Sequence, residues 1–323
     1  MATIMKKLTS FLISGILLIS ILIMVNPVSA DVYHVYESDG WQVLHDTIQG
    51  APPGSTIYVH AGTYYIKDGI EFSASNLTII GDSPFNTIID ATNAGVGNAI
   101  SSTSSYTTMK NITIRNASGA GFYLDGNYVY IENCISHSNA FDGFVTDDYG
   151  TLKNCLAYDN TDGFDDNSHC TYINCTAANN SSDGFYDDYG GTKVINCIAV
   201  GNGDEGFDIE DDGDPSEITY SNAWGNTGGD YDEQGPGIGS ISVDPKFATG
   251  RLGEYYLSIA SPSVDSGSDE SAALGLYNGF TTRTDEKWDK GTVDMGFHYA
   301  SSRDPTGSIP IMKILEILNK NKN

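Results

Sequence analysis

The sequence predicts an all-β fold, a single-stranded parallel β-helix whose coils of roughly 20–24 residues stack on one another. One pattern is repeated four times: Asn-Cys, then an Asn five residues on, then an acidic residue followed by Gly-Phe. The cysteines are separated by 21, 20 and 22 residues, and the phenylalanines by 20, 21 and 22. No window has an apolar stripe of helical period, and leucine is too scarce for a leucine-rich repeat.

Stacking places like residues in columns along the solenoid. Successive coils lie about 4.8 Å apart, so asparagine amides can hydrogen-bond along a column and phenylalanine rings can stack inside it. A degraded fifth copy follows, with Ser221 in the cysteine column and Asn226 in the asparagine column. The predicted columns are Asn139, Asn160, Asn180 and Asn202; Cys134, Cys155, Cys175 and Cys197; and Phe144, Phe164, Phe185 and Phe207.

Residues 31–54 are predicted to form an N-terminal cap with a short amphipathic helix, and residues 55–240 to form the coils. A cap is needed because an exposed terminal coil is an open sheet edge. Three apolar residues recur at helical spacing after two candidate N-caps, and a Pro-Pro-Gly turn ends the helix. The apolar residues are Trp41, Leu44 and Ile48, the candidate N-cap is Ser38 or Asp39, and the turn is Pro52-Pro53-Gly54.

The repeats and this opening resemble the right-handed, pectin-lyase-like parallel β-helix proteins of microbial surfaces. The resemblance implies a right-handed solenoid. It also implies that residues 241–300 are an irregular C-terminal closing segment, so the β-helix domain is expected to span residues 31–300. Residues 301–323 are expected to form a flexible linker and a two-turn amphipathic helix, which either folds back as a lid or contacts a partner.

The first 30 residues have the pattern of a secretory signal peptide. Lys6 and Lys7 precede an apolar run from Leu8 to Val25, and Val28-Ser29-Ala30 offers a small-residue cleavage site. This pattern predicts a secreted or cell-surface protein. The run of 18 residues is also long enough to span a membrane if it is not cleaved, so a retained anchor stays open as the alternative.

The chain is strongly acidic, with 42 Asp and Glu against 16 Lys and Arg and a formal net charge of -26. Such a charge excludes binding to nucleic acid or to an anionic surface by bulk electrostatics, and it favours cations as counterions. The alternative explanation is that acidity keeps an exported repeat protein soluble. Contact with a membrane is expected only if the leader is retained, because no other segment is apolar enough to span one.

The four cysteines of one column are predicted to be buried free thiols. Neighbours in the column would lie within the Cα distance of a disulfide, and export would permit oxidation. Side chains stacked in register point in parallel, however, which is the wrong dihedral for an unstrained bridge. Disulfides stay open as the alternative. Cys170 lies outside the column, and the absence of a Cys-x-x-Cys pair argues against a cysteine metal site.

An acidic residue stands directly before the glycine of each repeat, and more acids follow each phenylalanine. Two carboxylates one coil apart would repel by about 3 to 4 kcal/mol at an effective dielectric near 20. Such a column requires protons or cations, and calcium, which takes roughly six to eight oxygens, suits it. The alternative is that Asp-Gly makes a turn and each aspartate is solvated. The column is Asp142, Asp162, Asp183 and Glu205, and the further acids include Asp165, Asp166, Asp187, Asp188 and Asp208.

Residues 139–210 also resemble the calcium-dependent pectate lyases of polysaccharide lyase family nine, which have repeated Asn-x-x-Asp-Gly-Phe units. In that family an aspartate of one coil and an Asp-Asp-Gly-aromatic-Asp segment of the next hold the catalytic calcium. Asp204-Glu205-Gly206-Phe207-Asp208 matches the segment, with a glutamate for its second aspartate. Asp183 matches the ligand from the preceding coil. The resemblance therefore implies Ca²⁺ held by Asp183, Asp204, Glu205 and Asp208.

A second, poorer register of the motif uses Asp142 with Asp162 and Asp165, but Thr161 stands where an acid is needed. For either register the resemblance implies β-elimination on a uronate polysaccharide. In that reaction calcium binds the uronate carboxylate and acidifies the proton of the neighbouring carbon, which a lysine then removes.

The catalytic lysine is where this chain departs from the family. The family places it in a coil beyond the calcium ligands, and residues 209–245 contain no Lys or Arg. Lys246 comes next, in the closing segment, while Lys193 and Lys153 lie on preceding coils that could reach the same face. Nothing in the motif selects any of the three, and ordinary surface lysines are the alternative.

Three functions follow from these patterns. The first is a non-catalytic surface module that binds extracellular polysaccharide through a calcium-loaded acidic face. The second is a calcium-dependent polysaccharide lyase, and the third is a structural spacer of the cell envelope. Exposed tyrosines in the repeats would suit stacking on sugar rings, although each could equally be a packed strand residue. The tyrosines of the repeats are Tyr149, Tyr158, Tyr172, Tyr186 and Tyr189.

Overall fold

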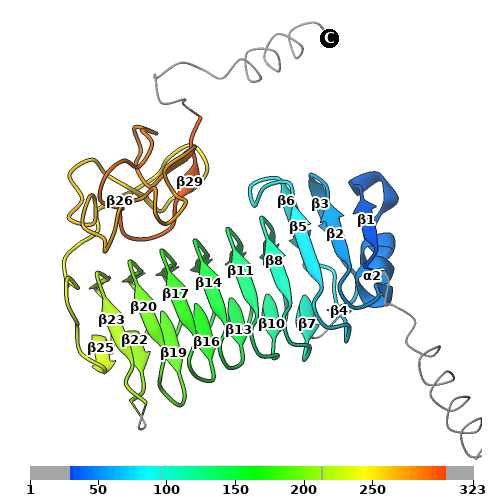
Figure 1. The fold of residues 1–323 in the computed structure, drawn as a ribbon, viewed down its shortest axis with the longest axis horizontal. Coiled ribbons are helices and arrows are strands. Elements are labelled where there is room, and N and C mark those ends of the chain that lie inside the picture. Colours follow the sequence, from blue (N-terminus) through cyan, green and yellow to red (C-terminus); the bar gives the residue numbers. More distant parts are fainter. Residues whose placement is uncertain (1–29, 96, 212–213, 303–323) are drawn as a thin grey trace, which may run out of the picture.

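The computed structural model of the protein describes residues 30–302, apart from residue 96 and residues 212–213. In this part of the chain, short strands form three parallel sheets that run the length of a solenoid (Figure 1). Each coil adds one strand to sheet A, then one to sheet B, then one to sheet C. The predicted parallel β-helix is therefore confirmed.

Each of the three sheets is a ladder of short strands, one from each successive coil. In spatial order, sheet A contains β1 (Val32–Val35), β2 (Thr56–Val59), β5 (Thr78–Gly81), β8 (Thr108–Lys110), β11 (Tyr130–Glu132), β14 (Thr151–Lys153), β17 (Thr171–Ile173), β20 (Lys193–Ile195) and β23 (Glu217–Thr219). Sheet B contains β3 (Gly62–Tyr65), β6 (Thr87–Asp90), β9 (Thr113–Arg115), β12 (Ile135–His137), β15 (Leu156–Tyr158), β18 (Thr176–Ala178), β21 (Ile198–Val200) and β24 (Asn222–Trp224). Sheet C contains β4 (Ile70–Glu71), β7 (Ile100–Ser102), β10 (Phe122–Leu124), β13 (Phe144–Thr146), β16 (Phe164–Asp166), β19 (Phe185–Asp187), β22 (Glu205–Ile209) and β25 (Gly229–Glu233).

The phenylalanine column lies inside the solenoid along sheet C. Phe144 pairs in register with Phe164, Phe164 with Phe185 and Phe185 with Phe207, and Phe122 extends the column by one coil. Neighbouring ring centroids lie between 4.6 and 5.1 Å apart, and the rings are fully buried. The predicted superposition is confirmed. Because side chains alternate along a strand, the residue after each phenylalanine points outward.

The predicted asparagine column is a continuous amide ladder. Nδ2 of Asn139 donates to Oδ1 of Asn160 at 3.0 Å, and Nδ2 of Asn160 donates to Oδ1 of Asn180 at 3.3 Å. The pattern continues through Asn202 to Asn226 at 3.0 and 2.9 Å. Each Oδ1 also accepts the backbone N–H of the preceding asparagine, as from Asn139 to Asn160 at 3.1 Å. The ladder therefore satisfies polar groups at the turn that leads into sheet C.

The N-terminal cap contains the 3-10 turn η1 (Glu37–Asp39) and the helix α2 (Trp41–Gly50). The predicted helix is thus present, and Leu44 and Ile48 are buried in the main core. Its N-cap is Gly40, and neither Ser38 nor Asp39 caps it, because both residues belong to the 3-10 turn.

All five cysteines are free and buried, which confirms the predicted thiol column. Cys170 lies in the interior, directly before strand β17 of sheet A. A Cβ at Gly150 in the preceding coil would lie 3.0 Å from the Cys170 Sγ, so this glycine leaves the room that the thiol occupies.

Residues 241–300 fold back along the outside of the coils and pack on the outer face of sheet B (Figure 1). This closing segment contains two antiparallel strand pairs, β26 (Phe247–Ala248) with β27 (Tyr256–Leu257) and β28 (Phe280–Thr281) with β29 (Tyr299–Ala300). Phe297 and Tyr299 pack on Ile135 and Leu156. The closing segment therefore leaves sheet C uncovered.

Hydrogen bonds from a second asparagine column also hold the closing segment. Asn154 Nδ2 donates to the His298 carbonyl at 3.0 Å, and the His298 backbone N–H donates to Asn154 Oδ1 at 2.6 Å. Asn174 Nδ2 donates to the Asp294 carbonyl at 2.8 Å. Asn196 Nδ2 likewise donates to Ser268 Oγ at 3.1 Å, so several coils bind the closing segment through side-chain amides.

The predicted leader and C-terminal helix lie outside the described residues. The leader covers residues 1–30, of which only residue 30 is described, and the linker and helix cover residues 301–323, of which only Ser301 and Ser302 are described. None of the helices in the described part of the chain is long and apolar enough to cross a membrane.

Candidate metal centre

The acidic column lies at the turn between sheet B and sheet C, directly before the phenylalanine column. The backbone N–H of Asp162 donates to Asp142 Oδ1 at 3.1 Å, and that of Asp183 donates to Asp162 Oδ1 at 2.7 Å. The N–H of Glu205 donates to Asp183 Oδ1 at 2.7 Å. Each carboxylate therefore holds the turn of the next coil, so the turn chemistry expected from Asp-Gly is present.

The glycine after each acidic residue is required by close packing between coils. A Cβ at Gly143 would lie 2.6 Å from the Gly163 carbonyl oxygen, and one at Gly184 would lie 2.5 Å from that of Gly206. A side chain at either position would push the coils apart. The repeated Gly-Phe pair thus sets both the tight turn and the inward direction of the ring.

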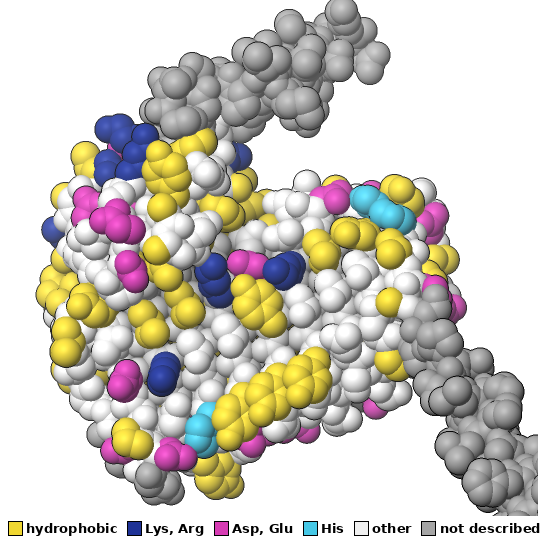
Figure 2. All heavy atoms as spheres, viewed as in Figure 1, with side chains coloured by type: hydrophobic (Ala, Val, Ile, Leu, Met, Phe, Trp, Pro, Cys, Tyr) yellow, Lys and Arg dark blue, Asp and Glu magenta, His cyan; other side chains and the backbone are white. Residues whose placement is uncertain are grey.

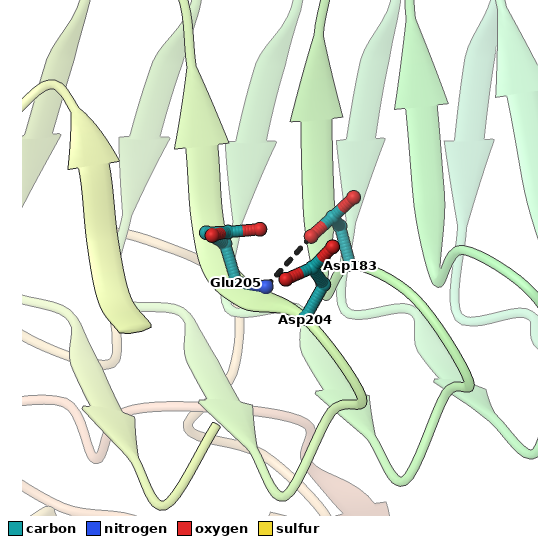
Figure 3. Close-up of side chains that lie close together, drawn as sticks. All are labelled: Asp183, Asp204 and Glu205. Atoms are coloured by element: carbon teal, nitrogen blue, oxygen red, sulfur yellow. Dashed lines mark hydrogen bonds between the residues drawn. The ribbon is translucent and has the colours of Figure 1, made fainter. Parts of the chain in front are cut away.

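Three acidic side chains converge at the fourth copy of the repeat. Asp183, Asp204 and Glu205 each offer one carboxylate oxygen, and these oxygens lie within 4.8 Å of one another (Figure 3). Asp183 comes from the preceding coil and is buried, whereas Asp204 is exposed and Glu205 is half-buried. We call these three residues the acidic cluster.

The fourth copy of the repeat differs from the other three because an acidic residue, Asp204, directly precedes its member of the acidic column, Glu205. Asp204 occupies the position that Thr161 and Ser182 occupy in the preceding coils, as shown by the backbone bonds that join the three positions. Thr161 uses its hydroxyl to donate to the Ala140 carbonyl at 3.0 Å. The extra carboxylate of Asp204 is what turns a column of single acids into a cluster.

The acidic cluster has the donors and the space that calcium needs. Three carboxylates offer up to about six oxygens, and calcium binds roughly six to eight, which leaves room for water or a ligand. Gly228 in the next coil leaves the space beside the cluster open. A Cβ there would lie 2.2 Å from Asp204 Oδ1 and 2.5 Å from Glu205 Oε1. The residues present therefore fit a calcium ion.

The charges of the acidic cluster are crowded. Partial burial raises the pKa of Glu205 to about 7, and the neighbouring carboxyls of Asp183 and Asp204 add to this rise. At 4.8 Å, two ionised carboxylates repel by about 3 to 4 kcal/mol at an effective dielectric near 20. The cluster near neutral pH therefore favours either a bound proton or a bound cation.

The structure does not bring the fourth expected ligand into the acidic cluster. Asp208 lies on β22, where it pairs with Tyr186 of β19 and with Asp232 of β25. Side-chain alternation places it on the outer face of sheet C, in the row that continues from Tyr186. Asp208 therefore extends the acidic surface from the cluster along this face.

The alternative register, Asp142 with Asp162 and Asp165, does not form such a cluster among the described residues. Asp142 and Asp162 are joined by the turn hydrogen bond, and Asp165 lies on the outer face of β16. Burial raises the pKa of Asp165 to about 7, with the charges of Asp142 and Asp162 adding to the rise. The acidic surface thus continues beyond the cluster, but with fewer converging oxygens.

The three candidate lysines lie away from this surface. Lys153 is on β14 and Lys193 is on β20, and both strands belong to sheet A. The Lys153 Nζ lies 3.6 Å from Glu132 Oε1, and the Lys246 Nζ donates to the Ala260 carbonyl at 3.1 Å. In the described part of the chain, no strand of sheet C carries a Lys or Arg.

A groove of about 440 Å³ lies on the N-terminal part of the same outer face. Glu71 of β4, Ser101 of β7 and Tyr123 of β10 line it, together with Asn98 and Gln49. The sheet C residues are successive members of one outward column, and Val145, Asp165, Tyr186 and Asp208 continue that column. Sheet C therefore offers a long polar face that connects the groove with the acidic side chains.

A second acidic group, Asp265, Asp289 and Asp294, lies in the closing segment. The N–H of Asp265 donates to Asp294 Oδ1 at 2.7 Å, and that of Asp294 donates to Asp289 Oδ2 at 3.0 Å. The same Asp289 oxygen lies 2.8 Å from the buried His298 Nε2. These bonds are internal to the closing segment, so we assign the group to its folding.

Comparison with known proteins gives a family match over most of the chain. Residues 23–240 match a family model described as the Pel9A-like, right-handed β-helix region. No curated protein matches the sequence.

Several solved structures have a similar fold at low sequence identity. The crystal structure of pectate lyase Pel9A is 15% identical, covers 76% of this chain and 94% of its own, and gives a TM-score of 0.50. The A-module of the Azotobacter vinelandii mannuronan C-5 epimerase AlgE4 is 19% identical, with coverages of 59% and 67% and a TM-score of 0.43. Pectin methylesterase PemA from Erwinia chrysanthemi is 11% identical, with coverages of 62% and 80% and a TM-score of 0.44.

Proposed function

Since the chain belongs to the Pel9A-like right-handed β-helix family, we propose that the protein is a secreted or cell-surface module that binds an acidic polysaccharide through calcium without cleaving it. The observation that carries the proposal is the convergence of Asp183, Asp204 and Glu205 beside sheet C. The similar fold of a pectate lyase supports polysaccharide as the class of partner. The leader-like pattern of residues 1–30 supports export.

The acidic cluster would hold the ion, and the outer face of sheet C would hold the sugar chain. Calcium bound at the cluster supplies the positive charge that attracts the carboxylates of a uronate chain. Without a cation, Asp165 and Asp208 make this face repel such a chain. Tyr123 and Tyr186 stand in the same outward column and offer ring surface and hydroxyls to sugar units.

The proposal of binding without cleavage rests on the missing base. β-Elimination needs a group that removes a carbon-bound proton, and the sheet C strands carry no Lys or Arg in the described chain. A calcium-dependent lyase is the second candidate, because Asp204 to Asp208 match the calcium-binding segment expected for that activity. A structural spacer is the third.

Retention on immobilised polygalacturonate, measured with calcium and then with a chelator, tests the proposed function. We expect the protein to be retained when calcium is present and to elute when the chelator removes it. Asp204→Asn should weaken apparent calcium affinity at least tenfold, since even the partners that orient metal ligands are worth about 10–100-fold. The control is Glu217→Gln, an exposed acid on β23 of sheet A and so outside the sheet C face, which should bind within about twofold of wild type.

The other outcomes separate the three candidates. Unsaturated products that absorb in the ultraviolet, formed from polygalacturonate with calcium, would identify a lyase. No binding to any of a panel of uronate polysaccharides, and no cleavage, would leave the spacer. Calcium itself is tested by thermal unfolding with and without chelator, because a ligand at about 100 times its Kd stabilises the folded state by about 2.7 kcal/mol. An unchanged midpoint would remove the metal from the proposal.

A further inference from the structure

Four aromatic side chains form an exposed row on the outside of the coils, at the turn between sheet C and sheet A. We call Tyr106, Tyr128, Tyr149 and His169 the aromatic row. The first two ring centroids lie 5.1 Å apart at an angle of 7°, the next two 5.1 Å at 12°, and the last two 4.9 Å at 35°. Figure 2 shows a straight row of hydrophobic side chains that ends in a histidine. The aromatic row therefore runs parallel to the solenoid axis.

The aromatic row is a surface feature, unlike the phenylalanine column. The three tyrosines are 57%, 48% and 44% exposed, in chain order, whereas the stacked phenylalanines are at most 1% exposed. Burial in the core therefore does not explain these rings. Their faces are largely covered by one another, so the row presents ring edges and hydroxyl groups to solvent.

The backbone does not require aromatic residues at these positions. Tyr106, Tyr128 and Tyr149 have φ angles of 63°, 59° and 61°, in the left-handed region. Asn76 and Gly191 occupy the same turn in the flanking coils, with φ angles of 60° and 80°. Asn and Gly adopt this region readily, whereas a tyrosine loses about 1 kcal/mol there. Three successive coils thus keep an aromatic ring where the turn itself favours a smaller residue.

The neighbours of the aromatic row decide the charge of its partner. Asp148 directly precedes Tyr149 and accepts hydrogen bonds from Asn167 and Ser168 of the next coil, at 3.1 and 2.8 Å. The His169 Nε2 lies 2.9 Å from Asp214 Oδ2. No Lys or Arg stands within the described turns that carry the row. An acidic border disfavours an anionic partner, while apolar edges with hydroxyls suit neutral sugar units.

We propose that the aromatic row binds a neutral polysaccharide chain that lies parallel to the solenoid axis, independently of calcium. The rings repeat at 5.1, 5.1 and 4.9 Å, so a polymer with a short repeating unit meets an equivalent ring and hydroxyl at each step. An extended pyranose chain has such a repeat. The proposal takes only the class of partner, polysaccharide, from the proposed function.

The test uses the triple variant Tyr106→Asn, Tyr128→Asn and Tyr149→Asn in the full chain. Asparagine occupies this turn naturally at Asn76, so the variant should keep the coil and unfold no earlier than wild type. The probe is an array of neutral glucans, galactans, mannans and xylans beside acidic polygalacturonate and alginate, read in chelator. The matched control replaces three exposed tyrosines of the N-terminal end, namely Tyr36, Tyr58 and Tyr65, by Asn.

We expect wild type and control to bind at least one neutral glycan in chelator, and the triple variant to bind it at least tenfold more weakly. Asp204→Asn should keep this neutral binding, so failure of the calcium site would leave it intact. Failure of wild type to bind any neutral glycan, or equal binding by the triple variant, would overturn the proposal. A change from dimer to monomer in the triple variant, with glycan binding unchanged, would also overturn it by assigning the row to a second copy of the chain.

Discussion

Glu205 is the residue of the acidic cluster whose charge changes near neutral pH. Partial burial and the carboxyls of Asp183 and Asp204 raise its pKa to about 7. Protons and calcium compete for the same oxygens, so a proton on Glu205 weakens calcium binding. If the cluster binds calcium as proposed, its affinity for calcium therefore depends on pH near neutrality.

Lowering the pH from about 8 to about 6 is expected to weaken calcium binding by up to about tenfold, since the lower value lies one unit below this pKa. The calcium-dependent shift of the thermal unfolding midpoint, measured at both pH values, gives the change. Glu205→Gln should bind calcium more weakly at both and lose the pH dependence. Equal calcium affinity of wild type at both pH values would contradict this assignment.

Asp166 and Asp187 lie inside the solenoid, one coil apart on sheet C. The Asp166 carboxylate accepts hydrogen bonds from the Tyr172 hydroxyl at 2.8 Å and the Thr192 hydroxyl at 2.9 Å. Asp187 Oδ2 has no hydrogen-bond partner in the described chain. Burial raises the pKa of Asp187 to about 6, and burial together with the Asp187 charge raises the pKa of Asp166 well above its usual range.

These raised pKa values predict that the chain is more stable in mild acid. The native state binds the proton of Asp187 more tightly than the unfolded state, so the free energy of unfolding falls as the pH rises from about 4 through about 6. The loss is on the order of 3 kcal/mol for a shift of about two pKa units. Chelator-treated wild type should therefore unfold at a higher temperature at pH 5 than at pH 8.

Asp187→Asn is the matched variant for this pH effect. It removes the titrating group while keeping its size, so the midpoints at pH 5 and pH 8 should approach each other. A pH difference as large as that of wild type would show that the effect comes from other groups, such as the acids of the outer face.

Inward aspartates show where reasoning from single residues ends. Because side chains alternate along a strand and Phe164 points inward, the pattern predicts that Asp165 points outward and Asp166 inward. The cost of burying a carboxylate argues against an inward Asp166, so from the sequence all acids after the phenylalanines look like surface residues. Hydroxyls of Tyr172 and Thr192, which stand on and beside sheet A, stabilise Asp166, and no local pattern predicts that they meet it.

The amide ladder joins successive coils at the turn that leads into sheet C. Asn160 Oδ1 accepts from the backbone and the side chain of Asn139, and its Nδ2 donates to the Ser136 carbonyl at 3.1 Å. Asn160 is buried, so its loss leaves several polar groups in neighbouring coils without partners.

Asn160→Ala is therefore expected to lower the free energy of unfolding by about 3 kcal/mol, because each buried polar group without a partner costs about 1–3 kcal/mol. Chemical denaturation measures the change. Asn226→Ala, at the end of the ladder where the asparagine is only half-buried, is the control and should cost less. An equal loss at both positions would show that the amides act independently and not as a ladder.

Elements built on the repeat could be predicted from its period. Outside the repeat the short cap helix could also be predicted from its apolar spacing, but the course of the closing segment could not. The period of about 21 residues predicts the Phe, Asn and Cys columns because stacking needs only the register. The aromatic row follows the same period from Tyr106 to Tyr149. The turn also accepts Asn and Gly, so tyrosine recurs in only three coils and the row is hard to recognise in the sequence. The course of the closing segment depends on pairs such as Asn154 with His298, which lie 144 residues apart and have no repeat.

At the scale of the whole molecule, the outer surfaces of the three sheets and their turns differ in composition and in what covers them. The outer face of sheet C is polar and acidic, and the turn between sheet C and sheet A carries the aromatic row. The closing segment covers the outer face of sheet B, where Phe297 packs on Ile135 and Leu156. Because the closing segment lies beside the coils and not between them, its loss need not break the stack.

Phe297→Ala tests whether the closing segment is a separate layer. Removing a buried phenylalanine costs about 3–5 kcal/mol at its site, and here the loss falls on the contact between the closing segment and sheet B. We expect proteases to cut within residues 241–300 well below the temperature at which the circular dichroism of the sheets is lost. Phe164→Ala, inside the column, is the control and should lower the unfolding midpoint of the sheets themselves. If Phe297→Ala instead lowers the midpoint of the sheets as much as Phe164→Ala does, the closing segment and the coils unfold as one cooperative unit, because the amides of Asn154 and Asn174 then transmit the loss.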